Sequence, residues 1–135
     1  MILCNKSVAH PWQCDVMGHL TTRFYVEMFD DASYHFLNEV FGWTPGVTGT
    51  PGWADVRHTI EYLDEVGPGD LLEISAQLVK LGGKSITTRY EMRNCTRDNL
   101  AATLESVSVC FDLEQRKAVT ISDDMRGRAQ AHLAS

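Results

Sequence analysis

The feature that most constrains the fold is a change of hydrophobic period near residue 50. Residues 21–42, TTRFYVEMFDDASYHFLNEVFG, place apolar side chains at steps of three or four, at Tyr25, Phe29, Ala32, Phe36 and Val40. That spacing is typical of one buried face of a helix. Beyond residue 52 the apolar residues recur at every second position, as in β-strands. The sequence therefore predicts a long helix followed by a sheet.

Sequence signals also give approximate bounds to the elements. Thr21 or Thr22 can cap the start of the helix and Gly42 can end it. A short strand is expected over residues 3–9, and a short C-terminal helix over about 122–134, where Ser122 precedes two aspartates. No repeat or linker divides the chain, so residues 1–135 are expected to form a single α+β domain.

Four strands are expected after the helix, joined by turns short enough to require antiparallel neighbours. Each of the first three strands is expected to place one set of side chains on a single face. The set is Val56, His58, Ile60 and Tyr62 in the first strand, Leu72, Ile74, Ala76 and Leu78 in the second, and Ile86, Thr88, Tyr90 and Met92 in the third. The last strand begins with Ala102 and Leu104 in phase and continues with Val107, Val109 and Phe111, which predicts a bulge near Glu105 or Ser106. One helix covers one face of the sheet and leaves its edges open, so edge-to-edge dimerisation is expected.

Charge and composition narrow the classes of function. The 135 residues carry a net charge of -6, which argues against a nucleic-acid partner. The sequence contains no run of about 18 apolar residues, so no membrane span is predicted. The N-terminal residues lack the pattern of a secretory signal, so a cytoplasmic location is expected. The four cysteines include no CxxC pair, so reduced thiols are expected and no metal site is predicted.

The residues that carry chemistry lie just before the helix, in WQCDVMGHLTTRFY, residues 12–25. Asp15, Gly18 and His19 stand here among apolar neighbours. Each also has an ordinary structural interpretation: a turn-forming Asp, a turn glycine and a hydrogen-bonding histidine.

With this loop the chain resembles the hot-dog-fold acyl-CoA thioesterases of the 4-hydroxybenzoyl-CoA thioesterase type. The loop is similar to that family's Asp-x-x-Gly-His motif, and GDLLEISAQLVKLGGKSITTRYEMRN and SVSVCFDLEQRKAVTIS are similar to its later strands and turns. The resemblance implies a long central helix wrapped by a five- or six-stranded antiparallel sheet. It also implies a homodimer or homotetramer with active sites between subunits. The chain departs from the family pattern at Gln13, where a second acid is common, and at Thr21 and Thr22, where an Asn is common.

The resemblance also implies roles for individual residues. Asp15 is the catalytic carboxylate, acting as nucleophile or general base, and the backbone N–H of Thr22 is the oxyanion donor. Gly18, His19, Tyr25 and His58 are candidate substrate-binding residues, although core packing is an alternative for Tyr25 and His58. Lys84 and Arg89, with Arg93, Arg116 and Lys117, are candidates for holding the CoA phosphates, and each is also an ordinary surface charge. No metal and no cofactor are expected beyond the CoA of the substrate.

Two other functions stay open on the sequence. The first is a hot-dog hydratase or dehydratase acting on enoyl or hydroxyacyl thioesters, which needs an Asp and a His working as a pair; the Asn-Pro of that family's loop is absent here. The second is a non-catalytic acyl-CoA-binding domain. The sequence ranks both below thioester hydrolysis.

Overall fold

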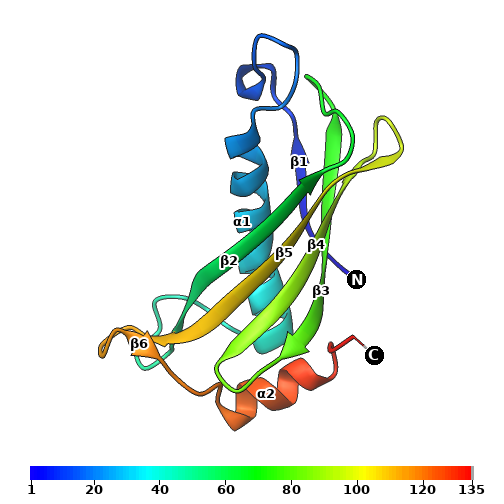
Figure 1. Cartoon of the computed structure of the whole chain (residues 1–135). Helices are drawn as coiled ribbons and strands as arrows, with labels where there is room; N and C mark the ends of the chain where they lie inside the picture. The colour runs from blue at the N-terminus through cyan, green and yellow to red at the C-terminus, as the bar shows by residue number, and fades with distance from the viewer. Residues whose placement is uncertain (135) are drawn as a thin grey trace.

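A computed structural model describes residues 1–134, and an antiparallel sheet dominates it (Figure 1). The strands lie in the order β1-β3-β4-β5-β2, and a short β6 pairs with the end of β5. Their bounds are β1 Ile2–Val8, β2 Gly52–Tyr62, β3 Leu71–Leu81, β4 Ser85–Asn94, β5 Asn99–Asp112 and β6 Lys117–Ala118. The long helix is α1, Thr22–Phe41; a 3-10 turn, η1, spans Pro11–Gln13; and α2, Asp123–Gln130, lies at the C-terminal end. This is the α+β hot-dog arrangement that the sequence predicted.

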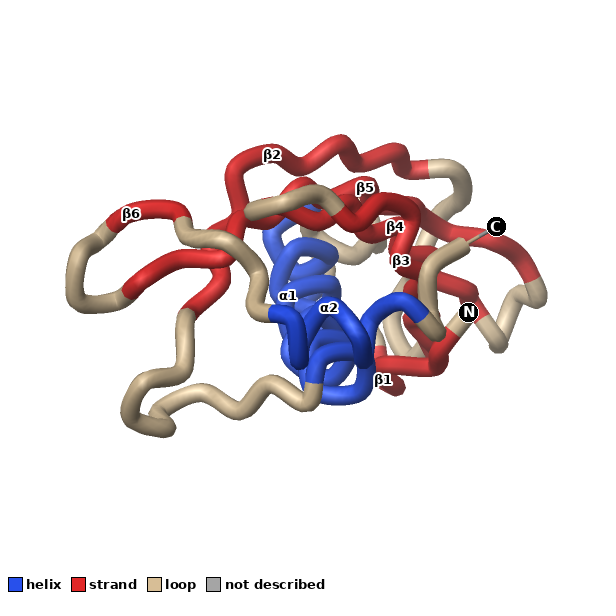
Figure 2. Tube along the Cα trace, turned by 90° about the horizontal axis from the view of Figure 1, so that it is seen from below, coloured by secondary structure: helices blue, strands red, loops and turns tan. Residues whose placement is uncertain are grey.

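Helix α1 lies along the concave face of the sheet, which curves around it (Figure 2). The five positions of its predicted apolar face are all buried, at 5% exposure or less. Gly42 ends the helix in the left-handed conformation at φ 65°, and its N–H donates to the carbonyl of Asn38 at 2.8 Å. A glycine adopts this conformation without the steric cost that a Cβ brings. The predicted helix is confirmed at both ends.

The face of the sheet that meets α1 follows the predicted alternation in β3 and β4, where all eight named positions are buried. In β5 the prediction was wrong. The strand keeps one phase from Ala102 through Leu104, Ser106, Ser108 and Cys110, all buried, while Val107 and Val109 lie half-buried on the outer face. β-Branched residues suit a half-buried sheet surface as well as a core, so the two valines did not mark the inner side.

The irregularities of the sheet lie elsewhere than predicted. Ala101 is the extra residue of β5 opposite β4, because Met92 pairs with Ala102 and Arg93 with Leu100. Val56 is the extra residue of β2, because Asp55 pairs with Ser108 and Arg57 with Val107. The expectation that Val56 shares a face with His58 was therefore wrong, and Val56 is 60% exposed.

The bulge at Ala101 helps to shape one end of the molecule. Its carbonyl accepts hydrogen bonds from the N–H groups of Leu63 and Asp64, at 2.8 and 3.2 Å. The chain that leaves β2 is thereby held against β5, beside the loop that precedes α1. Within residues 1–134, no helix is both long and apolar enough to cross a membrane.

Candidate active site

The loop before α1 is a tight, internally bonded turn. The N–H of Asp15 donates to the carbonyl of His19 at 2.9 Å, and the N–H of Gly18 donates to the carbonyl of Asp15 at 3.0 Å. Gly18 has φ +80°, a left-handed conformation that other residues adopt only with strain. The loop therefore needs a glycine at this position for its own backbone, whatever the glycine does for a ligand.

The carboxylate of Asp15 is held by one oxygen only. Oδ1 accepts from the N–H of Met17 at 2.9 Å and from the N–H of His19 at 3.2 Å. Oδ2 has no hydrogen-bond partner among residues 1–134. The side chain of this half-buried residue is thus fixed in direction while one oxygen remains available to a ligand or a water molecule.

The N-terminus of α1 presents unused hydrogen-bond donors next to this carboxylate. Thr21 is the N-cap residue, but its side chain caps nothing. Its own N–H donates to the carbonyl of Gln13, and its carbonyl accepts from the N–H of Phe24, both at 3.0 Å. In the described part of the chain the N–H groups of Thr22 and Arg23 have no partner. Free N–H groups at a helix start carry partial positive charge and suit an oxyanion.

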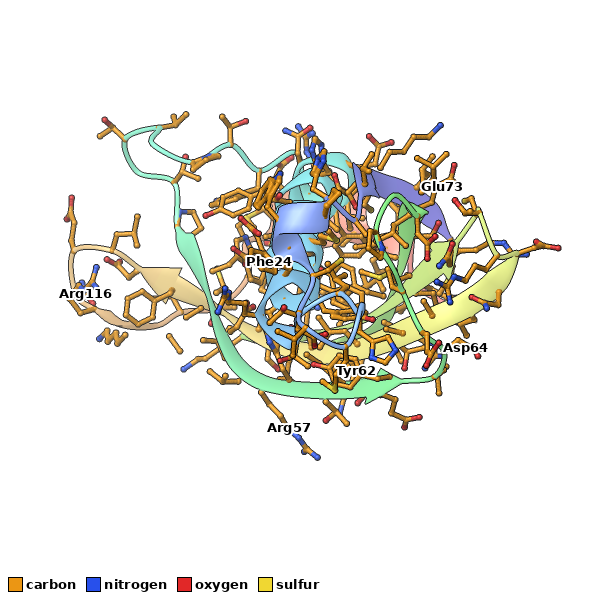
Figure 3. The ribbon with its side chains drawn as sticks, turned by 90° about the horizontal axis from the view of Figure 1, so that it is seen from above. Phe24, Arg57, Tyr62, Asp64, Glu73 and Arg116 are labelled. Carbon is orange, nitrogen blue, oxygen red and sulfur yellow. The ribbon has the colours of Figure 1, made fainter. Side chains whose placement is uncertain are left out.

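Asp15, Thr21 and Thr22 line one open pocket of about 500 Å³ at the end of the molecule, a size suited to a small-molecule ligand. Four of the predicted site residues, Asp15, His19, Thr22 and Tyr25, contribute to its wall. The opposite wall comes from the end of β2 and the segment after it, with Tyr62, Leu63, Asp64, Glu65 and Val66. Figure 3 labels Tyr62 and Asp64 on this wall.

The second wall has no signal in the sequence, because residues 65–70, EVGPGD, have the composition of a simple turn. Val66 is fully buried, and its carbonyl accepts from the N–H of Leu20 at 2.8 Å, so this turn packs against the loop. His19 Nε2 lies 2.9 Å from Glu65 Oε1. An acid facing a histidine across the pocket could not be recognised from a separation of 46 residues.

A buried carboxylate anchors this wall to the rest of the sheet. Asp70 Oδ2 accepts from the N–H of Gly67 at 2.9 Å and from Asn94 Nδ2 at 2.8 Å, and it lies 2.9 Å from Arg97 Nε. Arg97 also approaches Glu65 at 3.8 Å. The chain His19–Glu65–Arg97–Asp70 thus ties the Asp15 loop to the β4–β5 hairpin.

Tyr25 joins the pocket to the core. Its ring is buried and meets the ring of Tyr62 edge-on, with centroids 4.9 Å apart. Burial, with a smaller contribution from Tyr62, raises the pKa of the Tyr25 phenol to about 12. The phenol is therefore neutral at physiological pH and can donate a hydrogen bond.

Gly18 shapes the loop but does not line this pocket, and His58, Lys84 and Arg89 do not line it either. His58, in the middle of β2, pairs with Asp55 at 3.3 Å. Lys84 lies in the β3–β4 turn, at the α2 end of the molecule (Figure 1). Arg89 lies on β4 and pairs with Glu91 at 3.1 Å. Residues 1–134 contain no group of three or more His, Cys, Asp or Glu side chains arranged to hold a metal ion.

Comparison with models of known protein families gives one match. The family model described as the thioesterase-like superfamily matches residues 9–129. The solved structures that are similar include the probable thioesterase YbaW of Escherichia coli, with 21% identity, coverage of 99% of this chain and 100% of that chain, and a TM-score of 0.84.

Two further similar structures extend the comparison. A 1,4-dihydroxy-2-naphthoyl-CoA thioesterase of Synechocystis has 16% identity, coverage of 93% of each chain and a TM-score of 0.79. A hypothetical protein of Staphylococcus aureus, solved in complex with CoA, has 14% identity, coverage of 100% of this chain and 89% of that chain, and a TM-score of 0.85. At these identities the structures establish a shared fold. No curated protein matched the chain.

Proposed function

Because the chain belongs to the thioesterase-like superfamily and is a thioester hydrolase, we propose that it cleaves an acyl-CoA to a free acid and CoA, with Asp15 as the catalytic carboxylate. The observation that carries the proposal is the free Oδ2 of Asp15 beside the unpaired N–H groups that begin α1. A thioester needs a nucleophile and an oxyanion donor, and this pocket offers both.

In the proposed complex the thioester carbonyl oxygen accepts from the N–H of Thr22, with Asp15 Oδ2 facing the carbonyl carbon or a water molecule next to it. If the carboxylate attacks, a mixed anhydride forms and CoA leaves as its thiolate; water then hydrolyses the anhydride. If the carboxylate acts as a base, it takes a proton from water, whose oxygen attacks the carbonyl. A single turnover in ¹⁸O-labelled water tests for the first route, because only attack of water on the Asp15 carbonyl of an anhydride places solvent oxygen in Asp15 and releases an acid without any label.

We also propose that the working enzyme is a homodimer or homotetramer. Strand β2 pairs only with β5 among the described strands, so one of its edges is open to a second copy. Lys84 and Arg89 lie outside the pocket of their own chain, so the predicted contact with CoA would have to reach a pocket of a neighbouring copy. Molecular mass in solution tests the first proposal, and the KM for acyl-CoA of Lys84→Ala and Arg89→Ala tests the second.

The geometry favours hydrolysis over hydration. A hydratase needs Asp and His side chains that act as a pair, but His19 Nε2 faces Glu65, and the carboxylate of Asp15 bonds to the backbone N–H of His19 and not to its ring. Binding without catalysis would leave the free oxygen of Asp15 without a chemical role.

The proposal is tested by release of CoA from a panel of acyl-CoAs with short, long, aromatic and charged acyl groups. Detection by chromatography avoids interference from the four thiols of the chain. Asp15→Asn is expected to lose about 100-fold or more in kcat. Asp64→Asn, which also removes a carboxylate from the pocket wall, is the matched control. Binding of acyl-CoA without release by the wild type would replace the proposal with a binding function.

A further inference from the structure

The hydroxyl of Tyr25 is a hydrogen-bond donor that the folded chain leaves unused. The residue is buried, with 5% of its surface exposed, yet its Oη makes no hydrogen bond within residues 1–134. The hydroxyl of a buried tyrosine usually finds a partner. A buried donor without one needs an explanation, and a ligand is one such explanation.

The hydroxyl of Tyr25 opens on the candidate active site. Within residues 1–134, the fully enclosed side-chain oxygen and nitrogen atoms that lack a partner are Ser7 Oγ, Trp53 Nε1 and Asn99 Oδ1. Tyr25 Oη also lacks a partner but is not one of these enclosed atoms, so the small exposed part of the residue includes its hydroxyl. Because Tyr25 lines the pocket beside Asp15, the hydroxyl is reachable from that pocket.

Three carboxylates line the same pocket, those of Asp15, Asp64 and Glu65. Within the described chain none of them accepts a hydrogen bond from Tyr25. Asp15 accepts from backbone N–H groups of its own loop, and Glu65 faces His19. The donor is therefore not taken up by the acceptors of the site itself and is available to a ligand.

Tyr25 lies one turn beyond the N–H group that is proposed to bind the oxyanion. Tyr25 and Thr22 are three residues apart and share one face of α1. Side chains on a helix point back toward its N-terminus, so the ring of Tyr25 lies over the first turn. Three residues advance a helix by about 4.5 Å, which is less than the length of a tyrosine side chain. The hydroxyl can therefore reach the part of the pocket beside the N–H of Thr22.

The ring of Tyr25 is held in one orientation. It meets the ring of Tyr62 edge-on, at an angle of 82° between the ring planes, and the rest of the residue is buried in the core. A phenol on a fixed ring changes direction only by rotation of its O–H bond, so the donor is already in place before charge develops on a ligand. It also stays protonated at physiological pH, because burial raises its pKa to about 12.

Resting on the proposed function, we propose that Tyr25 is a second catalytic hydrogen-bond donor, whose hydroxyl bonds to the thioester carbonyl oxygen together with the N–H of Thr22. A carbonyl oxygen has two lone pairs and accepts from both donors at once. The phenol keeps its proton throughout the reaction. Its hydrogen bond becomes stronger as negative charge collects on the oxygen, so it stabilises the transition state more than the bound substrate.

The test compares Tyr25→Phe with wild type, because this change removes one hydroxyl and keeps the ring that packs against Tyr62. With the acyl-CoA that wild type hydrolyses fastest, kcat is expected to fall about 100-fold while KM changes by less than about threefold. S-butyl-CoA, a thioether without a carbonyl oxygen, should bind both proteins in calorimetry with Kd values within about threefold of each other. The Tm should change by less than about 2 °C, because the hydroxyl has no partner to lose within the described chain.

Tyr90→Phe is the matched control. Tyr90 is also a buried tyrosine, and its ring packs against Phe29 and Phe36 of α1, but it does not line the pocket. Its kcat is expected to stay within about threefold of the wild-type value. A loss shared by both variants would come from the packing of the core and would overturn the inference.

The remaining outcomes separate the inference from the proposed function. If Tyr25→Phe keeps its kcat within about threefold while Asp15→Asn loses about 100-fold, the inference is overturned and the proposed function stands. A rise in KM at unchanged kcat, or weaker binding of S-butyl-CoA, also overturns the inference, because the hydroxyl of Tyr25 would then act in substrate binding. If wild type releases no CoA from any acyl-CoA, both are overturned.

Discussion

Replacing Thr22 with proline tests the oxyanion donor separately from the fold. Proline lacks an N–H but is well accepted at the first position of a helix, which Thr22 occupies. The residue before a proline must be extended, and Thr21 already is, at φ -66° and ψ 138°. The N–H that disappears bonds to nothing in residues 1–134. The substitution therefore removes one hydrogen-bond donor from the pocket and little else.

The expected loss follows from what such donors contribute. Removing one oxyanion donor lowers kcat by about 100- to 1,000-fold, or about 3–4 kcal/mol of transition-state stabilisation. For Thr22→Pro we expect a loss in this range, with KM for acyl-CoA changed much less. Thr22→Ala keeps the N–H and should retain activity within about threefold. Thermal unfolding should place the two variants within about 3 °C of each other.

Steady-state release of CoA by the two variants provides the measurement. The assignment of this N–H is refuted if Thr22→Pro has the Tm of the alanine variant and its kcat stays within about threefold of the wild-type value. The unpaired N–H of Arg23 would then be the remaining donor at the start of α1.

Three further predictions concern the surroundings of the site. Asp70→Asn replaces a buried carboxylate, which accepts hydrogen bonds, with an amide that turns its own N–H groups toward the same donors. It should lower the free energy of unfolding by about 3 kcal/mol and Tm by about 10 °C; a shift in Tm under about 3 °C would contradict this. Glu65→Gln should lower kcat several-fold through His19 while Tm moves by less than about 2 °C, because the pair is exposed; unchanged kinetics would remove the pair from the mechanism. Since the folded state raises the pKa of Asp30, its charge costs stability above that pKa. Asp30→Asn should therefore raise Tm at pH 7 and lose this gain below about pH 4, relative to Asp31→Asn; a gain that is independent of pH would contradict the sign.

The sequence by itself determined the elements that repeat with a regular period. The apolar stripe of α1, its glycine end and the alternation of β3 and β4 follow from side chains that have to leave water on one face. The position of Asp15 just before the helix start was also readable, because a short motif and a helix boundary lie next to each other in the chain.

The tertiary structure decided what depends on contacts between distant segments. The alternation of β5 was misread because valine suits either face of a sheet, and only the pairing with β4 and β2 fixes which side is inner. Glu65 meets His19 because the segment that follows β2 lies against the loop that precedes α1. No local pattern records such a meeting, since it arises only when the sheet closes around the helix.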